Sequence, residues 1–207
     1  MKLRDPTHLF EGEISPRTER IAETISLIGQ PIFLPIPVFA LLCLLTDGAE
    51  EYLKIFGISL LFVVILPTFI TYYFSIKQGR RDGDIPDRTK RYPPMIIGTI
   101  SYAIGAAALY AVDAPRLITV LMLCYSIVTF VMLIITFRWK ISIHAVGVVG
   151  PTMALSFAFW PWGLLFILIL PPIVWSRYVL KKHTPAQLAA GAIVGFIITG
   201  TMFLLLL

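Results

Sequence analysis

Charge is scarce in this sequence. Lys, Arg, Asp and Glu make up 14% of its 207 residues, whereas 57% of the residues are hydrophobic. The charges gather between long apolar runs, which excludes an ordinary soluble domain and predicts an all-α polytopic membrane protein. We expect one compact transmembrane domain at residues 24–207, preceded by an N-terminal cytoplasmic segment at residues 1–23.

Cysteine is scarce as well. The sequence contains only Cys43 and Cys124, and both lie inside apolar runs. We interpret them as small buried hydrophobic residues, which excludes a disulfide framework or a cysteine metal site. The N-terminus also lacks an apolar stretch near its start, so we expect no cleavable signal peptide. Tandem repeats and low-complexity segments are absent from the sequence.

Long apolar runs are the dominant feature that is present. Five of them predict membrane-spanning helices, at about 24–46, 53–76, 94–112, 117–137 and 186–207. The stretch 141–175 is apolar too, but Trp160-Pro161-Trp162 interrupts it. Indole rings favour the headgroup level and proline ends a helix. We interpret this stretch as two short spans, with a re-entrant hairpin as the alternative, and expect six to seven transmembrane helices in total.

The basic residues are distributed asymmetrically across these spans. The layout places residues 1–23, 77–93, 138–144 and 176–185 on one face, and this face carries fifteen of the seventeen basic residues. They are Lys2, Arg4, Arg17, Arg20, Lys77, Arg80, Arg81, Arg88, Lys90, Arg91, Arg138, Lys140, Arg177, Lys181 and Lys182. Basic loops favour the cytoplasmic side, which predicts a cytoplasmic basic face and a C-terminus outside.

The first polar segment on this face is KQGRRDGDIPDRTKRYPP, residues 77–94. Such a charged run is usually a solvated loop that contacts lipid headgroups. Here, however, acids alternate with arginines, and a guanidinium held by a carboxylate is pre-organised to bind phosphate through two hydrogen bonds. The candidate phosphate ligands are Lys77, Arg81, Arg88 and Arg91, and the possible orienting carboxylates are Asp82, Asp84 and Asp87.

The second polar segment is RWKISIHAVGVVGP, residues 138–151. Lys140, Ser142 and His144 stand at the entrance of a predicted helix. A histidine there is most often an ordinary interfacial residue. Its pKa lies near neutral pH, however, so His144 is also a candidate to protonate a leaving oxygen. Ser142, Lys140 and the N–H groups of the helix N-terminus would favour an anion.

The third polar segment is SRYVLKKHTPAQLAAG, residues 176–191. Thr184 as an N-cap and Pro185 in the first turn predict a helix start. His183 and Gln187 are four residues apart, which places them on one face, and we expect Arg177 to point into the same cavity. Each segment alone is explained by interfacial polar residues. Three segments on one face favour a phosphate site.

Two of these segments resemble a known family. Ser176-Arg177, five further residues and His183 are similar to the third signature of the type 2 phosphatidic acid phosphatase (PAP2) superfamily, S-R-x5-H-x3-D. Ser142-Ile143-His144 resembles the second signature, P-S-G-H. The first signature, K-x6-R-P, is loosely echoed by the spacing of Arg81 and Arg88 and by Arg91-Tyr92-Pro93. The resemblance covers about residues 77–200.

The resemblance implies an integral-membrane phosphatase that uses no metal and no cofactor and forms a phosphohistidine intermediate. His183 would be the nucleophile, and His144 would protonate the leaving group and then activate water. Arg177, Ser142 and basic residues of 77–91 would hold the phosphoryl oxygens. The expected partners are the bilayer and a lipid phosphate or diphosphate, isoprenoid or glycerolipid, with no nucleic acid.

The chain departs from the family pattern at Gln187, where the signature has aspartate. A glutamine carbonyl can accept the imidazole N–H and fix its tautomer, but it supplies no negative charge, so Asp82, Asp84 or Asp87 would have to compensate. Two spans separate the first and second segments, which the family joins by a loop, and family members usually act on the outer face. These differences indicate a divergent member.

Two alternatives remain open. DGDIPDRTKRYPP loosely resembles the magnesium–diphosphate loop of UbiA-like membrane prenyltransferases, although residues 138–151 and 176–185 provide no second acidic loop. The other alternative is a non-catalytic, lipid-binding relative. Metal dependence separates the two enzymes, because EDTA should stop a prenyltransferase and leave a histidine phosphatase active.

Overall fold

The computed structural model describes residues 14–77, 79, 85, 87 and 89–207, and these residues form helices and no strands. Within them, five helical stretches are long and apolar enough to cross a membrane: Ala49–Ile76, Thr89–Ala111, Arg116–Arg138, Trp162–Val179 and Pro185–Leu206. This confirms the prediction of an all-α protein with helices long and apolar enough to span a membrane.

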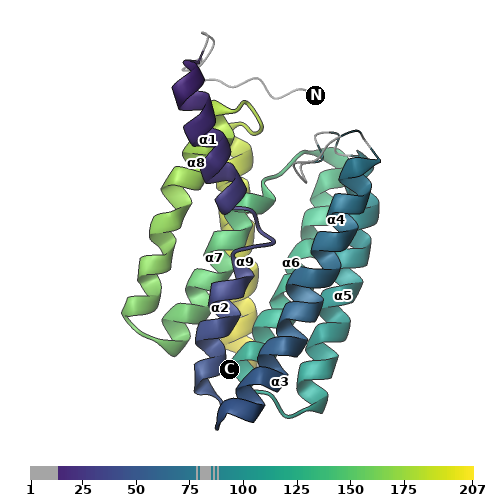
Figure 1. Cartoon of the computed structure of the whole chain (residues 1–207), viewed down its shortest axis with the longest axis vertical. Coiled ribbons are helices and arrows are strands. Elements are labelled where there is room, and N and C mark those ends of the chain that lie inside the picture. The colour runs from purple at the N-terminus through teal and green to yellow at the C-terminus, as the bar shows by residue number, and fades with distance from the viewer. Residues whose placement is uncertain (1–13, 78, 80–84, 86, 88) are drawn as a thin grey trace.

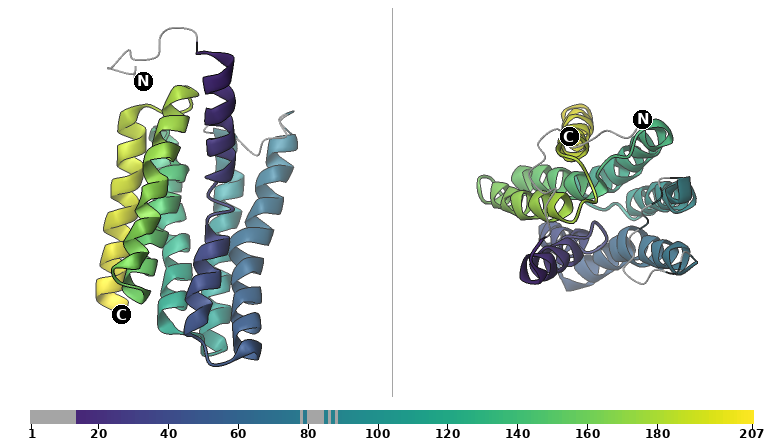
Figure 2. Two further views of the ribbon diagram at one scale, coloured as in Figure 1. Left: turned by 60° about the vertical axis from the view of Figure 1, so that its left-hand side comes forward. Right: turned by 90° about the horizontal axis from the view of Figure 1, so that it is seen from above.

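The helices run up and down a single bundle (Figure 1). Their order is α1 (Pro16–Ile28), α2 (Pro35–Leu42), η1 (Cys43–Leu45), α3 (Ala49–Leu60), η2 (Leu61–Ile65), α4 (Leu66–Ile76), η3 (Thr89–Arg91), α5 (Tyr92–Ala111), α6 (Arg116–Arg138), α7 (Ile143–Ala158), η4 (Trp162–Ile169), α8 (Leu170–Val179) and α9 (Pro185–Leu206). The ends of α4, α6 and α8 lie at the same end of the bundle as α1, and α9 finishes at the other end (Figures 1 and 2). This places the described parts of the three polar segments at one end of the bundle, in agreement with the prediction that they share a face.

The predicted continuous span at 24–46 is wrong, because the chain breaks there into α1 and α2. Gly29 ends α1, and its N–H donates to the carbonyl of Ile25. Pro31 lacks an N–H and disfavours helix at the residue before it, and Pro35 then starts α2. Helix α1 also continues across the domain boundary predicted between residues 23 and 24.

Gly29 is also where α1 meets α8. A Cβ atom at this position would lie 2.5 Å from the Cδ1 atom of Ile173, which is fully buried in α8. Only glycine allows this approach without a shift of Ile173, so the end of α1 is fixed against α8. The loop from Gln30 to Leu34 therefore begins at a defined position beside the bundle.

The stretch 141–175 forms two antiparallel helical arms that turn at Trp160-Pro161-Trp162, as the sequence predicts. Both tryptophans are strongly exposed, at 72% and 73%, as expected of rings at a headgroup level. Gly163 lets the arms cross closely, because a Cβ there would overlap the backbone of Leu155. The η4–α8 arm is long enough to span a membrane by itself, whereas α7 is shorter.

The core lies between α2, α3, α5, α6 and α9, where Phe39, Leu109, Leu121 and Phe203 are almost completely buried. Cys43 and Cys124 are free and buried in this core, which confirms their interpretation. Between α3 and α4 the helix widens to the π-helical turn η2 just before Pro67, which has no N–H to donate. Ser101 on α5 donates to the carbonyl of Phe62 in this turn.

Candidate active site

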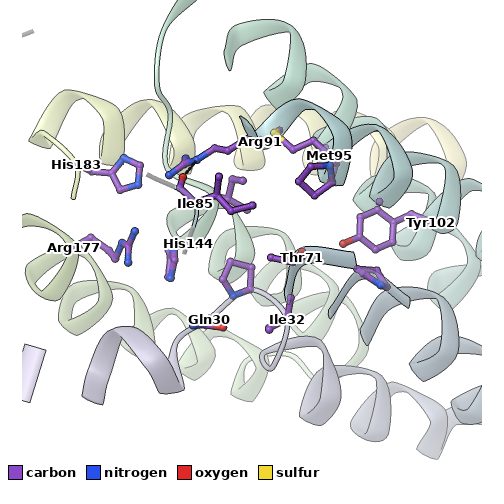
Figure 3. Close-up of a pocket in the computed structure, with 16 residues that line it drawn as sticks. Gln30, Ile32, Thr71, Ile85, Arg91, Met95, Tyr102, His144, Arg177 and His183 are labelled. Carbon is purple, nitrogen blue, oxygen red and sulfur yellow. Dashed lines mark hydrogen bonds between the residues drawn. The ribbon is translucent and has the colours of Figure 1, made fainter. Parts of the chain in front are cut away.

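Residues from each of the three polar segments line one cavity (Figure 3). Arg91 at the start of α5, His144 at the start of α7, Arg177 near the end of α8 and His183 before α9 all line it. Its volume is about 160 Å³, many times the roughly 10–15 Å³ that one water molecule requires. The cavity is therefore large enough for a phosphate group together with part of what it is attached to.

The fold of residues 176–184 explains why Arg177 and His183 share this cavity. Helix α8 ends at Val179, and Lys181 adopts a left-handed conformation with φ of 53°. The chain then turns back, so that the N–H groups of Lys182 and His183 both donate to the carbonyl of Arg177, at 3.0 and 3.3 Å. This reversal brings His183 back beside Arg177 despite the five residues between them.

Gln187 holds the His183 imidazole from the first turn of α9. The Gln187 Oε1 atom accepts from the backbone N–H of Thr184 at 3.2 Å, and it lies 3.3 Å from Nδ1 of His183. The Thr184 hydroxyl accepts in return from the Gln187 N–H, which completes a capping box. Because Oε1 can only accept, the proton of a neutral imidazole belongs on Nδ1, and Nε2 keeps its lone pair.

The surroundings of His183 favour its neutral form. The side chain is only 5% exposed, and the pKa of His183 is lowered to about 2, first by burial. Positive neighbours lower the pKa further, in the order Arg177, Lys140, Arg91 and His144. At neutral pH the imidazole is therefore uncharged, which is the state a nucleophilic nitrogen needs.

Two buried arginines add positive charge to the cavity. Arg177 is 3% exposed, and its Nη1 donates to the Ser26 hydroxyl of α1 at 2.8 Å. Arg91 is 8% exposed, and its Nε donates to the carbonyl of Ile85. Helices α5, α7 and α9 also begin around the cavity, and helix N-termini attract negative charge. The described lining residues include no Asp or Glu, so these walls suit an anion.

Ser142 and Lys140 lie beside the cavity but are not among its lining residues. Ser142 is fully buried, and its hydroxyl has no hydrogen-bond partner within the described part of the chain. Its N–H donates to the carbonyl of Gln187 at 3.3 Å. The Lys140 Nζ donates to the carbonyl of Lys182 at 2.7 Å. Both residues thus tie the second polar segment to the third, and their roles as phosphate ligands stay predictions.

The first polar segment contributes Arg91 to the cavity. Lys77 is exposed instead, with its ammonium 4.5 Å from the ring centroid of Tyr73. Asp87 is exposed too, and it accepts from the N–H and the hydroxyl of Thr89 at 2.9 and 2.8 Å. The other candidates in this segment, Arg81, Arg88, Asp82 and Asp84, lie outside the described residues.

Several lining residues were missed in the sequence. Gln30 and Pro31 come from the loop between α1 and α2, and Thr71, Gly98 and Tyr102 line the wall toward the membrane interior. The break at Gly29-Gln30-Pro31 was visible in the sequence, because a polar residue between a glycine and a proline is unusual in a span. Nothing in the sequence indicated that Ser26 would bond to Arg177.

No protein-family model matches this chain, and no curated protein or solved structure is significantly similar to it. The PAP2 resemblance therefore depends on the residues of the second and third polar segments alone. Chemically, the cavity combines a neutral imidazole, a second histidine and two guanidinium groups. Such a set can bind a phosphate and transfer a phosphoryl group without a metal ion.

Proposed function

We propose that this protein is an integral-membrane lipid phosphatase of a divergent PAP2 type, which hydrolyses a lipid phosphate or diphosphate through a phosphohistidine. The observation that supports it most is the state of His183. Its Nδ1 is engaged by Gln187, its Nε2 keeps a lone pair, and it lines a cavity with Arg91, Arg177 and His144.

The first chemical step transfers the phosphoryl group to His183. The Nε2 lone pair attacks phosphorus, and the bond between phosphorus and the leaving oxygen breaks with its electron pair on that oxygen. His144, entering the step as imidazolium, gives this oxygen its proton and becomes neutral. Arg91 and Arg177 bind the equatorial phosphoryl oxygens and offset the charge that builds up on them.

The second step releases the phosphate. Neutral His144 now takes a proton from a water molecule, whose oxygen attacks phosphorus as the P–N bond breaks. The bonding electrons return to Nε2 of His183, inorganic phosphate leaves, and His144 is protonated again. The net reaction consumes one water and yields one alcohol, or one lipid monophosphate where the substrate is a diphosphate.

The membrane supplies the substrate in this proposal. The cavity opens at the basic end of the bundle, where the phosphate of a lipid would meet positive side chains while its chain stays among the helices. The excess of Lys and Arg at this end supports a cytoplasmic orientation. The proposal includes α7 and α2 as membrane-embedded elements, which would bring the transmembrane helices to the predicted six to seven.

The decisive experiment measures phosphate release from a panel of lipid phosphates by the purified protein in the presence of EDTA. We expect activity with the wild type and a loss of at least about a thousandfold in His183→Ala and His144→Ala, because each change removes a reacting group. Lys54→Ala is the control and should keep full activity, because Lys54 is exposed on α3 and does not line the cavity.

Quenching the reaction with alkaline detergent tests the intermediate directly, because the P–N bond of phosphohistidine survives in base. A base-stable, acid-labile phosphoryl label on the protein should appear in the wild type and be absent from His183→Ala. Activity that survives both histidine substitutions would overturn this mechanism. Activity that EDTA abolishes would instead favour the magnesium-dependent prenyltransferase alternative.

A further inference from the structure

A second, deeper chamber continues from the cavity into the bundle. The two spaces share the lining residues Pro31, Tyr102, Thr129 and Ile143. Beyond them the deeper chamber is lined by Leu121, Cys124, Tyr125, Val128, Val146, Gly147, Gly150, Pro151 and Thr199. Its walls thus come from α5, α6, α7, α9 and the α1–α2 loop, and most of them are apolar.

The chamber reaches far from the phosphate end. Thr199 lies about four turns along α9 from Pro185, and at 1.5 Å per residue this is roughly 20 Å. Cys124 is similarly far from Arg138 at the end of α6. Helix α9 has 22 residues, so Thr199 lies past its midpoint and the chamber extends into the half of the bundle away from the phosphate end. Its mostly apolar walls suit hydrocarbon and do not suit a second phosphate.

Glycines keep the chamber open on its α7 side. A Cβ atom at Gly150 would lie 3.3 Å from the Thr199 hydroxyl oxygen, and one at Gly147 would lie 3.2 Å from Cβ of Pro31. Both contacts would be tight. A side chain longer than a methyl group at residue 147 or 150 would therefore extend into the chamber. The space between α7, α9 and the α1–α2 loop therefore exists because residues 147 and 150 have no side chains.

The chamber is small. Its volume is about 60 Å³, which holds roughly four to six water-sized groups at 10–15 Å³ each. This volume admits a segment of one hydrocarbon chain and leaves no room for a second. We propose that the chamber binds the chain of a single-chain lipid phosphate, such as a polyprenyl or alkyl phosphate, while its phosphate lies between Arg91, Arg177 and His183.

This inference rests on the proposed function and narrows its substrate class. Binding in the chamber brings no gain from leaving water, because the surrounding lipid is equally apolar. Its effect is to orient the substrate, so that phosphorus is held in line with Nε2 of His183. The chamber should therefore raise kcat for long single chains and leave short-chain substrates unaffected.

A photoreactive analogue tests the location of the chain independently of catalysis. The probe is a hexadecyl phosphonate, which cannot be hydrolysed, with a diazirine in the middle of its chain. We expect adducts within residues 121–128 and 146–151 of the wild type, and at least a fivefold lower yield in Gly150→Leu. Gly57→Leu is the matched control, because Gly57 is exposed on α3 with open space around it. In the wild type, adducts confined to lipid-facing residues such as Phe69 would overturn the proposal. This outcome does not depend on whether Gly150→Leu folds.

Turnover of matched substrates provides the second test. Wild-type kcat should be at least tenfold higher for hexadecyl phosphate than for butyl phosphate or for a diacyl phosphatidate. Gly150→Leu should lose this preference for the long chain, while Gly57→Leu should keep it. Equal rates for one-chain and two-chain substrates would overturn the single-chain assignment.

The rates of hydrolysis of farnesyl phosphate and hexadecyl phosphate by the wild type are then compared. The faster substrate shows whether the chamber prefers an isoprenoid or a straight alkyl chain. If the wild type released no phosphate from any of these compounds, the phosphatase proposal would fail. The adduct map would still decide whether the chamber holds a chain.

Discussion

The described residues of the loop between α4 and α5 have different surroundings from those of the junction between α8 and α9. At the junction, Arg177, Lys182 and His183 are joined by backbone hydrogen bonds, and Lys140 donates to it from another segment. In the loop, Lys77 lies over Tyr73 of its own helix and Asp87 accepts from Thr89, and both residues are exposed. Burial separates the arginines that line the cavity, Arg91 and Arg177, from the exposed Lys77, which does not line it.

Removal of one cation from each region tests this difference most strongly. Arg177→Ala should lower kcat/KM for a lipid phosphate by about a hundredfold to a thousandfold, because it removes a group that offsets charge in the transition state. Lys77→Ala should change kcat/KM by less than about twofold. Comparable losses in the two variants would contradict the distinction between the regions.

Gly191 determines how closely the second polar segment approaches the third. A Cβ there would overlap the carbonyl oxygen of Ser142, whereas at Gly195 the nearest atom, the Cα of Val146, lies at an ordinary 3.4 Å. Gly191→Ala should therefore lower the free energy of unfolding by about 1–3 kcal/mol. It should also lower kcat by at least tenfold, because His144 moves away from His183.

Gly195→Ala is the control for this effect, because it introduces the same atom one helical turn further along α9 and should leave kcat within about twofold. Melting temperature and phosphate release, measured on the same preparations in detergent, separate the two consequences. A fully active Gly191→Ala protein would show that this approach is not required.

The pH dependence of stability should report the burial of His183. Its folded pKa of about 2 lies below the ordinary value near 6.5, so below pH 6.5 the unfolded chain binds a proton that the folded chain excludes. Stability is therefore lost as pH falls, by up to about 2 kcal/mol between pH 6.5 and 5. His183→Gln should remove this part of the acid sensitivity in thermal unfolding, and Lys54→Ala, at an exposed position of α3, should retain it.

Substitution of Gln187 should have the smallest effect on kcat among these variants. It tests how the junction between α8 and α9 orients His183. Gln187→Glu keeps an oxygen for the Thr184 N–H and for Nδ1 of His183, and it adds a negative charge that stabilises the positive charge developing on the imidazole as Nε2 attacks phosphorus. We expect kcat to rise by about twofold to fivefold. Gln187→Leu removes both contacts and should lower kcat by about tenfold. Equal activity in both variants would show that Gln187 does not orient the imidazole.

The sequence was sufficient to predict most helices and the common face of the polar segments. Long apolar runs and the Trp160-Pro161 turn determine where the chain reverses, and the number of reversals determines the faces. The break between α1 and α2 was missed because hydropathy is continuous there, although Pro31 and Pro35 interrupt the backbone. Hydropathy measures how favourably a residue transfers from water to lipid, and it does not register that proline lacks a backbone N–H group.

The candidate site was predictable only where local spacing determines geometry. His183 and Gln187 are one turn apart at a capped helix start, so their contact follows from the sequence. Which basic residue of 77–91 reaches the cavity does not follow, because a loop fixes no direction for its side chains. The contact between Ser26 and Arg177 joins residues 151 positions apart, and a single sequence contains no record of such a distant pair.

That distant pair changes what the N-terminal helix means for experiments. Deletion of residues 1–28 would leave all five helical stretches that the described residues provide for crossing a membrane. It would nevertheless remove the Ser26 hydroxyl that accepts from the Arg177 guanidinium and the helix that holds Gly29 against Ile173. A version of this protein shortened in this way therefore has a different cavity, and any activity measured on it would describe that altered cavity.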